Sequence, residues 1–302
     1  MTYEDLLKDS AERDSRIIVL TAENRAAIRN LPASLGERFI DVGIAEQTMV
    51  GAAAGLALRG RIPLVHALAT FLTLRAFEFI RTDVGIGNLP VKLIGGVPGF
   101  LSDANGPTHQ AIEDIALMRG IPNVNVFCPA DLQELVAGIP AIINHPAPWY
   151  VRYNASPPGV THTGRFQIGQ AEVLSNGSDV AILAFGFLLR EAERARHILE
   201  ERSLSVRLVN LRTLKPIDEA VILAAAKETR LLVTLEDHFH TGGLASIVTE
   251  ILFRSGVQAP LHSIALPDRW FKPALLEDVL EHEGFTGRQI AERILAAASS
   301  TP

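Results

Sequence analysis

The chain has 302 residues, of which 48% are hydrophobic and 21% are charged, and its formal net charge is −6. Its length allows two sizeable cores, and its acidic balance, with no run of Lys or Arg, disfavours nucleic acid or an anionic membrane as a partner. The single cysteine, Cys128, excludes an intrachain disulfide framework. With no signal-peptide pattern and no apolar run of about 20 residues, the sequence indicates a cytoplasmic protein.

Short β-rich runs alternate with helical patterns in the first half of the chain. Helices are expected over 45–59, 72–84 and 130–144, and Asp131 at the start of the last one suits the helix dipole. The expected strands are apolar throughout and separated by helices, which predicts a parallel sheet covered on both faces. These strands are expected at 16–20, 38–42, 62–66, 91–95, 124–128 and 149–153.

The stretch "NASPPGVTHTG" at 154–164 is rich in Pro, Gly, Ser and Thr, as in a linker. Beyond it the alternation of strand and helix begins again. The sequence therefore predicts an α/β protein with two domains, 1–158 and 165–302, each with a mostly parallel sheet. In the second domain, strands are expected at 180–185, 205–210, 230–235 and 261–265, and helices at 187–202, 217–227, 242–255 and 286–298.

Glu46 is the first candidate for a functional residue. It follows the expected strand 38–42 directly, and ligands of such sheets bind at the carboxyl ends of the strands. An ordinary alternative is that a glutamate in the first turn of a helix offsets the helix dipole. The residues around Glu46 decide between these two interpretations.

Several stretches resemble the C-terminal half of transketolase and of the related deoxyxylulose-phosphate synthases. The resemblance runs from about residue 15 to about residue 300, and it is closest to the separate C-terminal subunits of two-chain transketolases. It implies a pyrimidine-binding domain followed by a transketolase C-terminal domain, with thiamine diphosphate bound between two chains. The stretches are "RFIDVGIAEQTMVGAAAGLALRG", "ATFLTLRAFEFIRTDV", "NLPVKLIGG", "NGPTHQAIEDIALMRGIPNVNVFCPAD" and "LRTLKPID".

The resemblance implies a cofactor role for four residues. Glu46 matches the glutamate that hydrogen-bonds the pyrimidine ring and promotes loss of the proton from the thiazolium carbon. Burial among the small residues of 51–57 would raise the pKa of its carboxyl by desolvation. Phe71 matches an aromatic residue that stacks on the pyrimidine. Leu68 stands where many transketolases have a second aromatic residue, and Ile44 is the remaining expected cofactor contact.

Substrate contacts are implied for four further residues. His109 matches the histidine that reaches the hydroxyl and carbonyl oxygens of the donor, and an imidazole can also move a proton near neutral pH. Asn105 stands where transketolases commonly have Asp. Arg75 is expected either at the site entrance or in a salt bridge on its helix. Arg152 matches an arginine that binds substrate phosphate, whereas Val97 replaces a phosphate-contacting histidine.

The sequence lacks the Gly-Asp-Gly segment with a later Asn that holds Mg²⁺ and the diphosphate in this family, and it shows no convincing metal-ligand spacing. We therefore expect this chain to contribute no metal ligand. We expect an N-terminal partner subunit to bind Mg²⁺ and the diphosphate, in an α₂β₂ heterotetramer. His238 and Gly242–Gly243 match a structural or interface motif of the C-terminal domain.

The implied activity is transfer of a two-carbon ketol unit from a ketose, expected to be phosphorylated, to an aldose acceptor. Asn105 and Val97 leave the exact sugars open. One alternative is the beta subunit of a 2-oxo acid dehydrogenase or of a decarboxylating or acyloin-forming enzyme, although "GPTHQAIEDIALMR" argues against it. Another is a non-catalytic regulatory subunit with the same fold, against which Glu46, Phe71 and His109 argue together.

Overall fold

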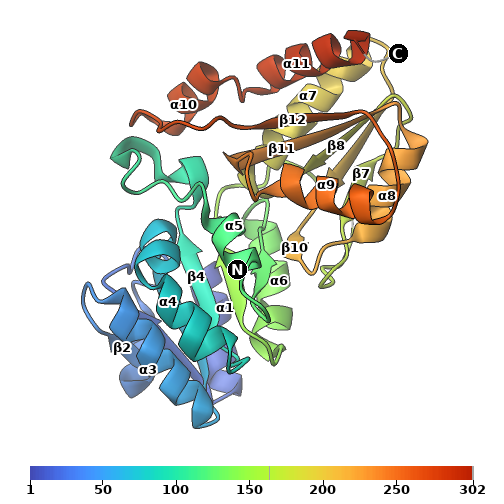
Figure 1. Ribbon diagram of the computed structural model, residues 1–302. Coiled ribbons are helices and arrows are strands. Elements are labelled where there is room, and N and C mark those ends of the chain that lie inside the picture. The colour runs from blue at the N-terminus through green and yellow to red at the C-terminus, as the bar shows by residue number, and fades with distance from the viewer. Residues whose placement is uncertain (163, 301–302) are drawn as a thin grey trace.

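The computed structural model describes residues 1–162 and 164–300. The chain forms two α/β domains, each built on its own mostly parallel sheet, which confirms the predicted fold class. In Figure 1 the blue and green N-terminal domain lies at the lower left, and the yellow and red C-terminal domain at the upper right.

The first sheet has seven strands in the order β10-β5-β6-β4-β3-β1-β2. Every strand pair in it is parallel except β10 with β5, which is antiparallel. The strands are β1 (Ile17–Thr21), β2 (Phe39–Asp41), β3 (Ile62–Leu68), β4 (Lys92–Gly96), β5 (Asn125–Phe127), β6 (Trp149–Arg152) and β10 (Thr213–Lys215).

Helices cover both faces of this sheet, which explains why its strands are apolar throughout. Ile17 and Val19 of β1 pack in one core with α1 and α6, and the alternate residues Ile18 and Leu20 pack in another core with α3. The helices of this domain are α1 (Tyr3–Arg13), α2 (Leu31–Leu35), α3 (Glu46–Leu58), α4 (Phe77–Phe79), α5 (Asp114–Arg119) and α6 (Leu132–Asn144).

The second sheet has five strands in the order β12-β11-β8-β9-β7, with β7 antiparallel to β9 at one edge. Its strands are β7 (Glu172–Ser175), β8 (Val180–Ala184), β9 (Val206–Asn210), β11 (Leu231–Phe239) and β12 (Leu261–Leu266). Its helices are α7 (Leu189–Glu201), α8 (Glu219–Glu228), α9 (Leu244–Arg254), α10 (Leu276–Glu283) and α11 (Gly287–Ser300).

All ten expected strands are present, but the expected helix over 72–84 is not continuous. It is divided into a π-helix η2 (Phe71–Arg75), the short α4 and a second π-helix η3 (Ile80–Gly85). The structure adds β7, β10 and the helices α1, α2, α5 and α10, which the sequence did not predict. Shorter helical segments are η1 (Gly36–Arg38), η4 (Gly99–Asn105) and η5 (Gly186–Leu188).

Besides the linker, a strand pairing and a backbone hydrogen bond join the two domains. β10 comes from the second half of the chain and extends the first sheet beside β5. The amide of Phe239 at the end of β11 donates to the carbonyl of Ile112 at 2.9 Å. The domain boundaries 1–158 and 165–302 remain a proposal. They assign β10 to the second domain, although β10 pairs with the sheet of the first domain. Within the described ranges, no helix combines the length and apolar character needed to cross a membrane.

Candidate active site

Glu46 is the first residue of α3 and lies beyond the carboxyl end of β2. β2 ends at Asp41, whose carboxylate accepts the amide of Gly43 at 3.0 Å. Gly43 has a φ of 71°, a conformation that favours glycine. This turn leads into α3 and leaves Glu46 only 2% exposed. The structure therefore places a buried carboxylate at the edge of the sheet where ligands of such folds bind.

The carboxylate of Glu46 is paired with Arg75 from η2. Nη1 of Arg75 lies 3.1 Å from Oε1 and 3.0 Å from Oε2 of Glu46. The Cζ atom of Arg75 lies 4.1 Å from the centroid of the Phe71 ring, a cation–π contact. The side chain of Arg75 is 40% exposed, so it connects a buried group to solvent. Of the two interpretations of Arg75, the structure shows the salt bridge, and a substrate contact stays a prediction.

Phe71 also contacts His109, which comes from the loop after β4. Their ring centroids are 5.0 Å apart with an interplanar angle of 65°, an edge-to-face arrangement. Nδ1 of His109 lies 2.9 Å from Oγ1 of Thr108. Asn105, at the end of η4, is exposed and donates from Nδ2 to the carbonyl of Ser102 at 3.3 Å. Three segments distant in sequence thus bring four predicted residues into one continuous series of contacts, which we call the Glu46 cluster: Glu46, Arg75, Phe71 and His109.

The two other expected cofactor contacts flank this cluster in the sequence. Ile44 is 72% exposed, two residues before Glu46. Leu68 is the last residue of β3 and is half-buried, three residues before Phe71. Their roles toward a cofactor remain predictions.

One face of α3, together with Ile44 just before the helix, is exposed and carries no charge. We call it the α3 face: Ile44, Thr48, Ala52, Gly55 and Leu58. Leu58 is 73% exposed, and the segments beside α3 add Phe79 at 37% and Ile86 at 72%. A helix that is apolar on all sides is ordinarily buried on all sides. The α3 face therefore has the character of a surface covered in an assembly.

Arg152 differs from the expectation that it binds a substrate phosphate. Its side chain is only 3% exposed, and it lies between two buried carboxylates. Nε is 2.9 Å from Oδ2 of Asp114, and Nη1 is 2.6 Å from Oδ1 of Asp237. Nη2 donates to the carbonyl of Ala111 at 3.1 Å. In this structure the guanidinium holds the two domains together and presents no exposed donor to a ligand.

Val97, at the position of the missing histidine, directly follows β4 and has a φ of 45°. A β-branched residue rarely adopts this left-handed conformation, so the backbone is strained there. This strained residue begins the loop that carries Asn105 and His109, and the sequence offered no sign of it.

His238 and Gly243 have the structural role that was expected of them. His238 is fully buried, and its Nε2 accepts the amide of Ala116 from α5 at 3.3 Å. A Cβ atom at Gly243 would lie 2.0 Å from Oε2 of Glu236. His238 therefore packs the C-terminal domain against α5, whereas Gly243 leaves room inside that domain for the side chain of Glu236.

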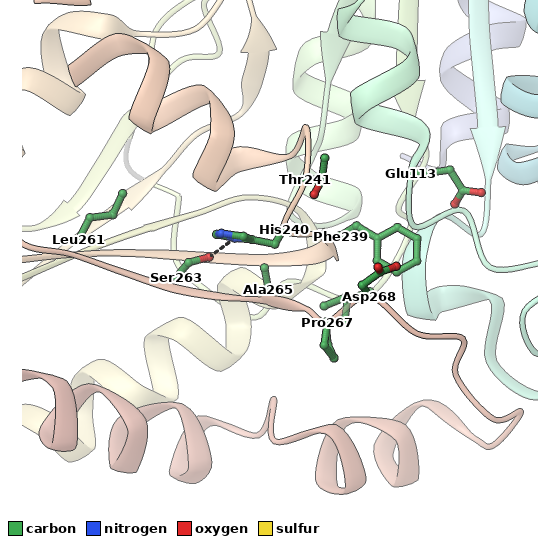
Figure 2. A pocket seen from close by; sticks show the side chains of 10 residues that line it. Glu113, Phe239, His240, Thr241, Leu261, Ser263, Ala265, Pro267 and Asp268 are labelled. Carbon is green, nitrogen blue, oxygen red and sulfur yellow. Dashed lines mark hydrogen bonds between the residues drawn. The ribbon is translucent and has the colours of Figure 1, made fainter. Parts of the chain in front are cut away.

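A recess of about 960 Å³ is lined mainly by residues of the second domain, and no residue of the Glu46 cluster lines it (Figure 2). His240 and Ser263 meet on its wall, with Nδ1 of His240 3.1 Å from Oγ of Ser263. Glu113 faces it from the first domain, and burial raises the pKa of that carboxyl. None of the sequence-predicted site residues lines this recess, so its size alone does not locate the chemistry.

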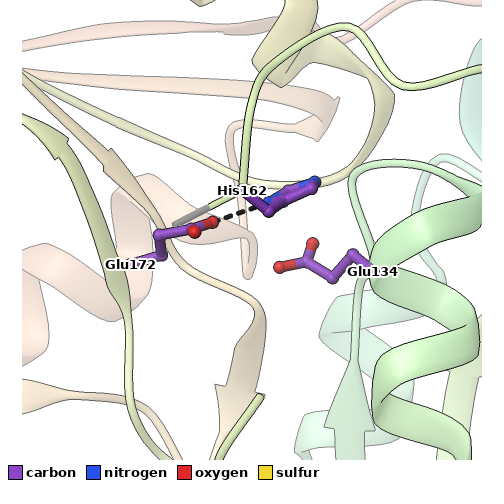
Figure 3. Close-up of side chains that lie close together, drawn as sticks. All are labelled: Glu134, His162 and Glu172. Carbon is purple, nitrogen blue, oxygen red and sulfur yellow. Dashed lines mark hydrogen bonds and ion pairs between the residues drawn. The ribbon is translucent and has the colours of Figure 1, made fainter. Parts of the chain in front are cut away.

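A second polar cluster lies where the two domains meet (Figure 3). Side-chain ligand atoms of Glu134, His162 and Glu172 lie within 4.8 Å of one another, as metal ligands do. However, Arg212 lies 3.0 Å from Glu134 and 3.1 Å from Glu172, so a cation already compensates both carboxylates. The sequence did not predict this cluster, and its charges make it an ion-pair network rather than a metal site.

Comparisons with known proteins agree with this arrangement. The transketolase pyrimidine-binding domain matches residues 1–157, and the transketolase C-terminal domain matches residues 169–290. The 6-deoxy-6-sulfo-D-fructose transketolase subunit SqwH of Clostridium sp. (strain MSTE9) is 35% identical over 96% of this chain and 91% of its own length. A putative transketolase C-terminal section of Methanocaldococcus jannaschii is 33% identical over 97% of this chain and 94% of its own length.

Solved structures show the same likeness. A split-gene transketolase, described as an inactive beta4 tetramer, has a TM-score of 0.89 at 33% identity and covers 99% of this chain and 98% of its own. A Pichia stipitis transketolase shares the fold, with a TM-score of 0.80 at 20% identity over 46% of its own chain. The comparisons favour neither a 2-oxo acid dehydrogenase subunit nor a non-catalytic subunit. The chain belongs to the transketolase family, in which it corresponds to the separate C-terminal subunit of a split transketolase.

Proposed function

We propose that this chain is the pyrimidine-binding half of a two-subunit, thiamine-diphosphate-dependent enzyme that transfers a two-carbon ketol unit from a ketose to an aldose. The observation that carries the proposal is the Glu46 cluster. It combines a buried carboxylate, an aromatic face and an imidazole at the carboxyl edge of the first sheet. These are the side chains that a heteroaromatic ring and a sugar carbonyl require from this half of the site.

The cluster has the form of half a site. None of the five recesses described on this chain is lined by a residue of the Glu46 cluster. A cofactor held only by this surface would stay largely in water, whereas ligand pockets normally bury most of a ligand. A second chain that covers the cluster would complete the pocket.

The residues present fit the pyrimidine end of the cofactor and do not fit its diphosphate end. Among residues 1–162 and 164–300, the one group with the spacing of metal ligands is the Glu134, His162 and Glu172 cluster, which is already paired with Arg212. We therefore assign Mg²⁺ and the diphosphate to the partner subunit.

The α3 face is the surface that we assign to this partner. It begins at Ile44, two residues from the buried carboxylate, so a chain seated on it would also cover the Glu46 cluster. Its small side chains allow close approach of another backbone, and Leu58 offers an apolar anchor. We expect an α₂β₂ heterotetramer. The one cysteine, Cys128, is buried and free, in keeping with the reducing cytoplasm expected from the sequence.

Each residue of the cluster then has a task. When bound, thiamine diphosphate supplies the carbon nucleophile that takes up the two-carbon unit. Glu46 holds or gives a proton at the pyrimidine ring, and Phe71 orients that ring and excludes water. His109 donates to the donor's oxygens and moves a proton during carbon–carbon cleavage. We assign to Asn105, which is exposed at the end of η4, a hydrogen bond to a substrate hydroxyl.

We propose that the anionic end of the donor is bound by a group other than Arg152, because Arg152 is buried and already paired with two carboxylates. Val97 replaces the other expected phosphate ligand. The relative from Clostridium is named for 6-deoxy-6-sulfo-D-fructose, a ketose that carries a sulfonate. We therefore propose a ketose with an anionic end group, either phosphate or sulfonate, as the donor.

The test is co-expression of this chain with the neighbouring gene product that carries the Gly-Asp-Gly and Asn segment. Purified pairs are given thiamine diphosphate and Mg²⁺, and ketol transfer is measured from xylulose 5-phosphate and, in parallel, from 6-deoxy-6-sulfofructose. We expect transfer by the pair, none by either chain alone, and a loss of at least about a hundredfold in Glu46→Gln, as for removal of a proton donor. Transfer from neither ketose, with turnover of a 2-oxo acid instead, would contradict the proposal.

A further inference from the structure

The side chain of Arg75 contacts both residues, Glu46 and Phe71, that the proposed function assigns to the pyrimidine ring. Arg75 donates from Nη1 to both oxygens of Glu46, at 3.1 and 3.0 Å, and its Cζ lies 4.1 Å from the Phe71 centroid. A guanidinium is flat and carries N–H donors along its edge, so it stacks on a ring and pairs with a carboxylate at once. An aminopyrimidine ring makes the same two contacts, with its face and with its edge.

We propose that Arg75 is a placeholder for the pyrimidine ring. In the subunit without cofactor its guanidinium fills the half-site between Glu46 and Phe71, and it leaves when the ring binds. This inference rests on the proposed function, because it takes Glu46 and Phe71 as the pyrimidine contacts. It adds that binding is an exchange of one flat group for another.

Exposure shows which of the two paired groups can move. The side chain of Arg75 is 40% exposed, whereas that of Glu46 is 2% exposed. A guanidinium that swings outward is solvated at once. The carboxylate stays buried, and a buried charge without a partner is strongly destabilising. Arg75 therefore compensates Glu46 until another donor takes its place.

The local backbone suits such an exchange. Phe71 and Arg75 are the first and last residues of the π-helix η2, a conformation that is rare and is frequent at functional sites. The two side chains lie on one side of that turn, as their contact shows. Rotation about the side-chain bonds of Arg75 removes the guanidinium without displacing the backbone that carries Phe71.

The first part of the test uses the isolated full-length chain and a double-mutant cycle in chemical denaturation. The variants are Arg75→Met, Glu46→Gln and their combination. We expect Arg75→Met to raise the unfolding equilibrium constant at least about tenfold beside Glu46, and much less beside Gln, because only Glu46 leaves a buried charge unpaired. The matched control pair is Arg254 with Glu219, also 3.0 Å apart but 62% and 50% exposed, for which we expect coupling of less than about fivefold.

The second part measures cofactor binding to the complex with the partner subunit, by titration calorimetry with thiamine diphosphate and Mg²⁺. Arg75→Met should bind at least about threefold more tightly than wild type, because no competing group must first leave. Arg254→Met should bind as wild type does. If Arg75→Met fails to fold, Arg75→Lys replaces it, since lysine keeps the charge without the flat stacking group.

Equal or weaker binding by the Arg75 variant, in a complex whose wild type binds, would overturn the placeholder and leave the proposed function standing. Absence of coupling in the denaturation cycle would overturn it as well. If the wild-type complex itself binds no cofactor, the proposed function fails first and the placeholder fails with it. Loss of cofactor binding in the wild-type complex therefore counts against the proposed function, whereas the absence of tighter binding in the Arg75 variant alone counts against the placeholder.

Discussion

Nε2 of His162 lies 2.9 Å from Oδ2 of Asp131, so the segment that connects the two domains is tied to the N-terminus of α6. Nδ1 of the same ring lies 2.7 Å from Oε2 of Glu172 in β7. A neutral imidazole has a single N–H, and only the doubly protonated ring donates to both carboxylates. With both carboxylates ionised, the geometry therefore favours a charged histidine as the bridge between the domains.

Replacement of His162 should make stability depend on pH in a defined way. Burial lowers the pKa of His162, but its hydrogen bonds to Asp131 and Glu172 outweigh this and raise it to about 10. A group whose pKa is raised on folding stabilises most below its unfolded pKa, about 6.5, and this contribution is lost as the pH rises toward 10. His162→Gln should therefore lower the free energy of unfolding by roughly 3 kcal/mol at pH 6 and by much less at pH 10.

Urea denaturation at a series of pH values measures this difference. His282→Gln, at an exposed position of α10, is the control and should show no such trend. A constant difference between His162→Gln and wild type from pH 6 to pH 10 would show that the bridge is uncharged.

Lys92 should give the opposite pH dependence. It is fully buried in β4, where Nζ donates to the carbonyls of His145 and Ala147 at 2.6 and 2.8 Å, and burial lowers its pKa to about 7. Between pH 7 and about 10.5 the unfolded chain binds the proton that the folded chain has released, so stability rises with pH. Lys92→Met should remove this rise, and Lys227→Met, exposed on α8, should retain it. The slope of unfolding free energy against pH measures the effect; an unchanged slope in Lys92→Met would refute it.

Arg152→Met should destabilise the fold rather than weaken binding of an anionic substrate. It would leave Asp114 and Asp237 buried, and loss of one partner from a buried ion pair costs about 3–5 kcal/mol. Arg207→Met is the control, because Arg207 pairs with an exposed Glu228 and should contribute at most about 1 kcal/mol. Both values come from denaturation of the isolated chain. A stable Arg152 variant with a raised KM only for anionic donors would restore the phosphate role.

Ala52→Glu should prevent assembly with the partner subunit while leaving the isolated chain folded. Ala52 is exposed at the centre of the α3 face, so the new carboxylate is solvated in the free subunit and would be buried without a partner in the complex. Ala220→Glu, exposed on α8, is the matched control. Analytical ultracentrifugation of each variant mixed with the partner measures assembly. Normal assembly by Ala52→Glu would remove the α3 face from the interface.

The sequence by itself determined the strands that are buried on both faces, because unbroken apolar runs between helices leave few other solutions. Through motifs that resemble those of a known family it also predicted that Glu46, Phe71 and His109 share one site, and the structure brings their three segments into one series of contacts. It could not predict β7 or β10, since edge strands of three or four residues carry little pattern of their own and form by pairing with β9 and β5.

Only the tertiary structure decided which charges are paired. The residues next to Arg152 and Arg75 in the sequence do not reveal whether either arginine contacts a ligand or forms an ion pair within the protein. The fold brings Asp237, 85 positions away, to 2.6 Å from Arg152, and it brings Glu46, 29 positions away, to 3.0 Å from Arg75. The physical reason is that the strength of a charge pair depends on distance and burial, and both are set by how distant segments pack.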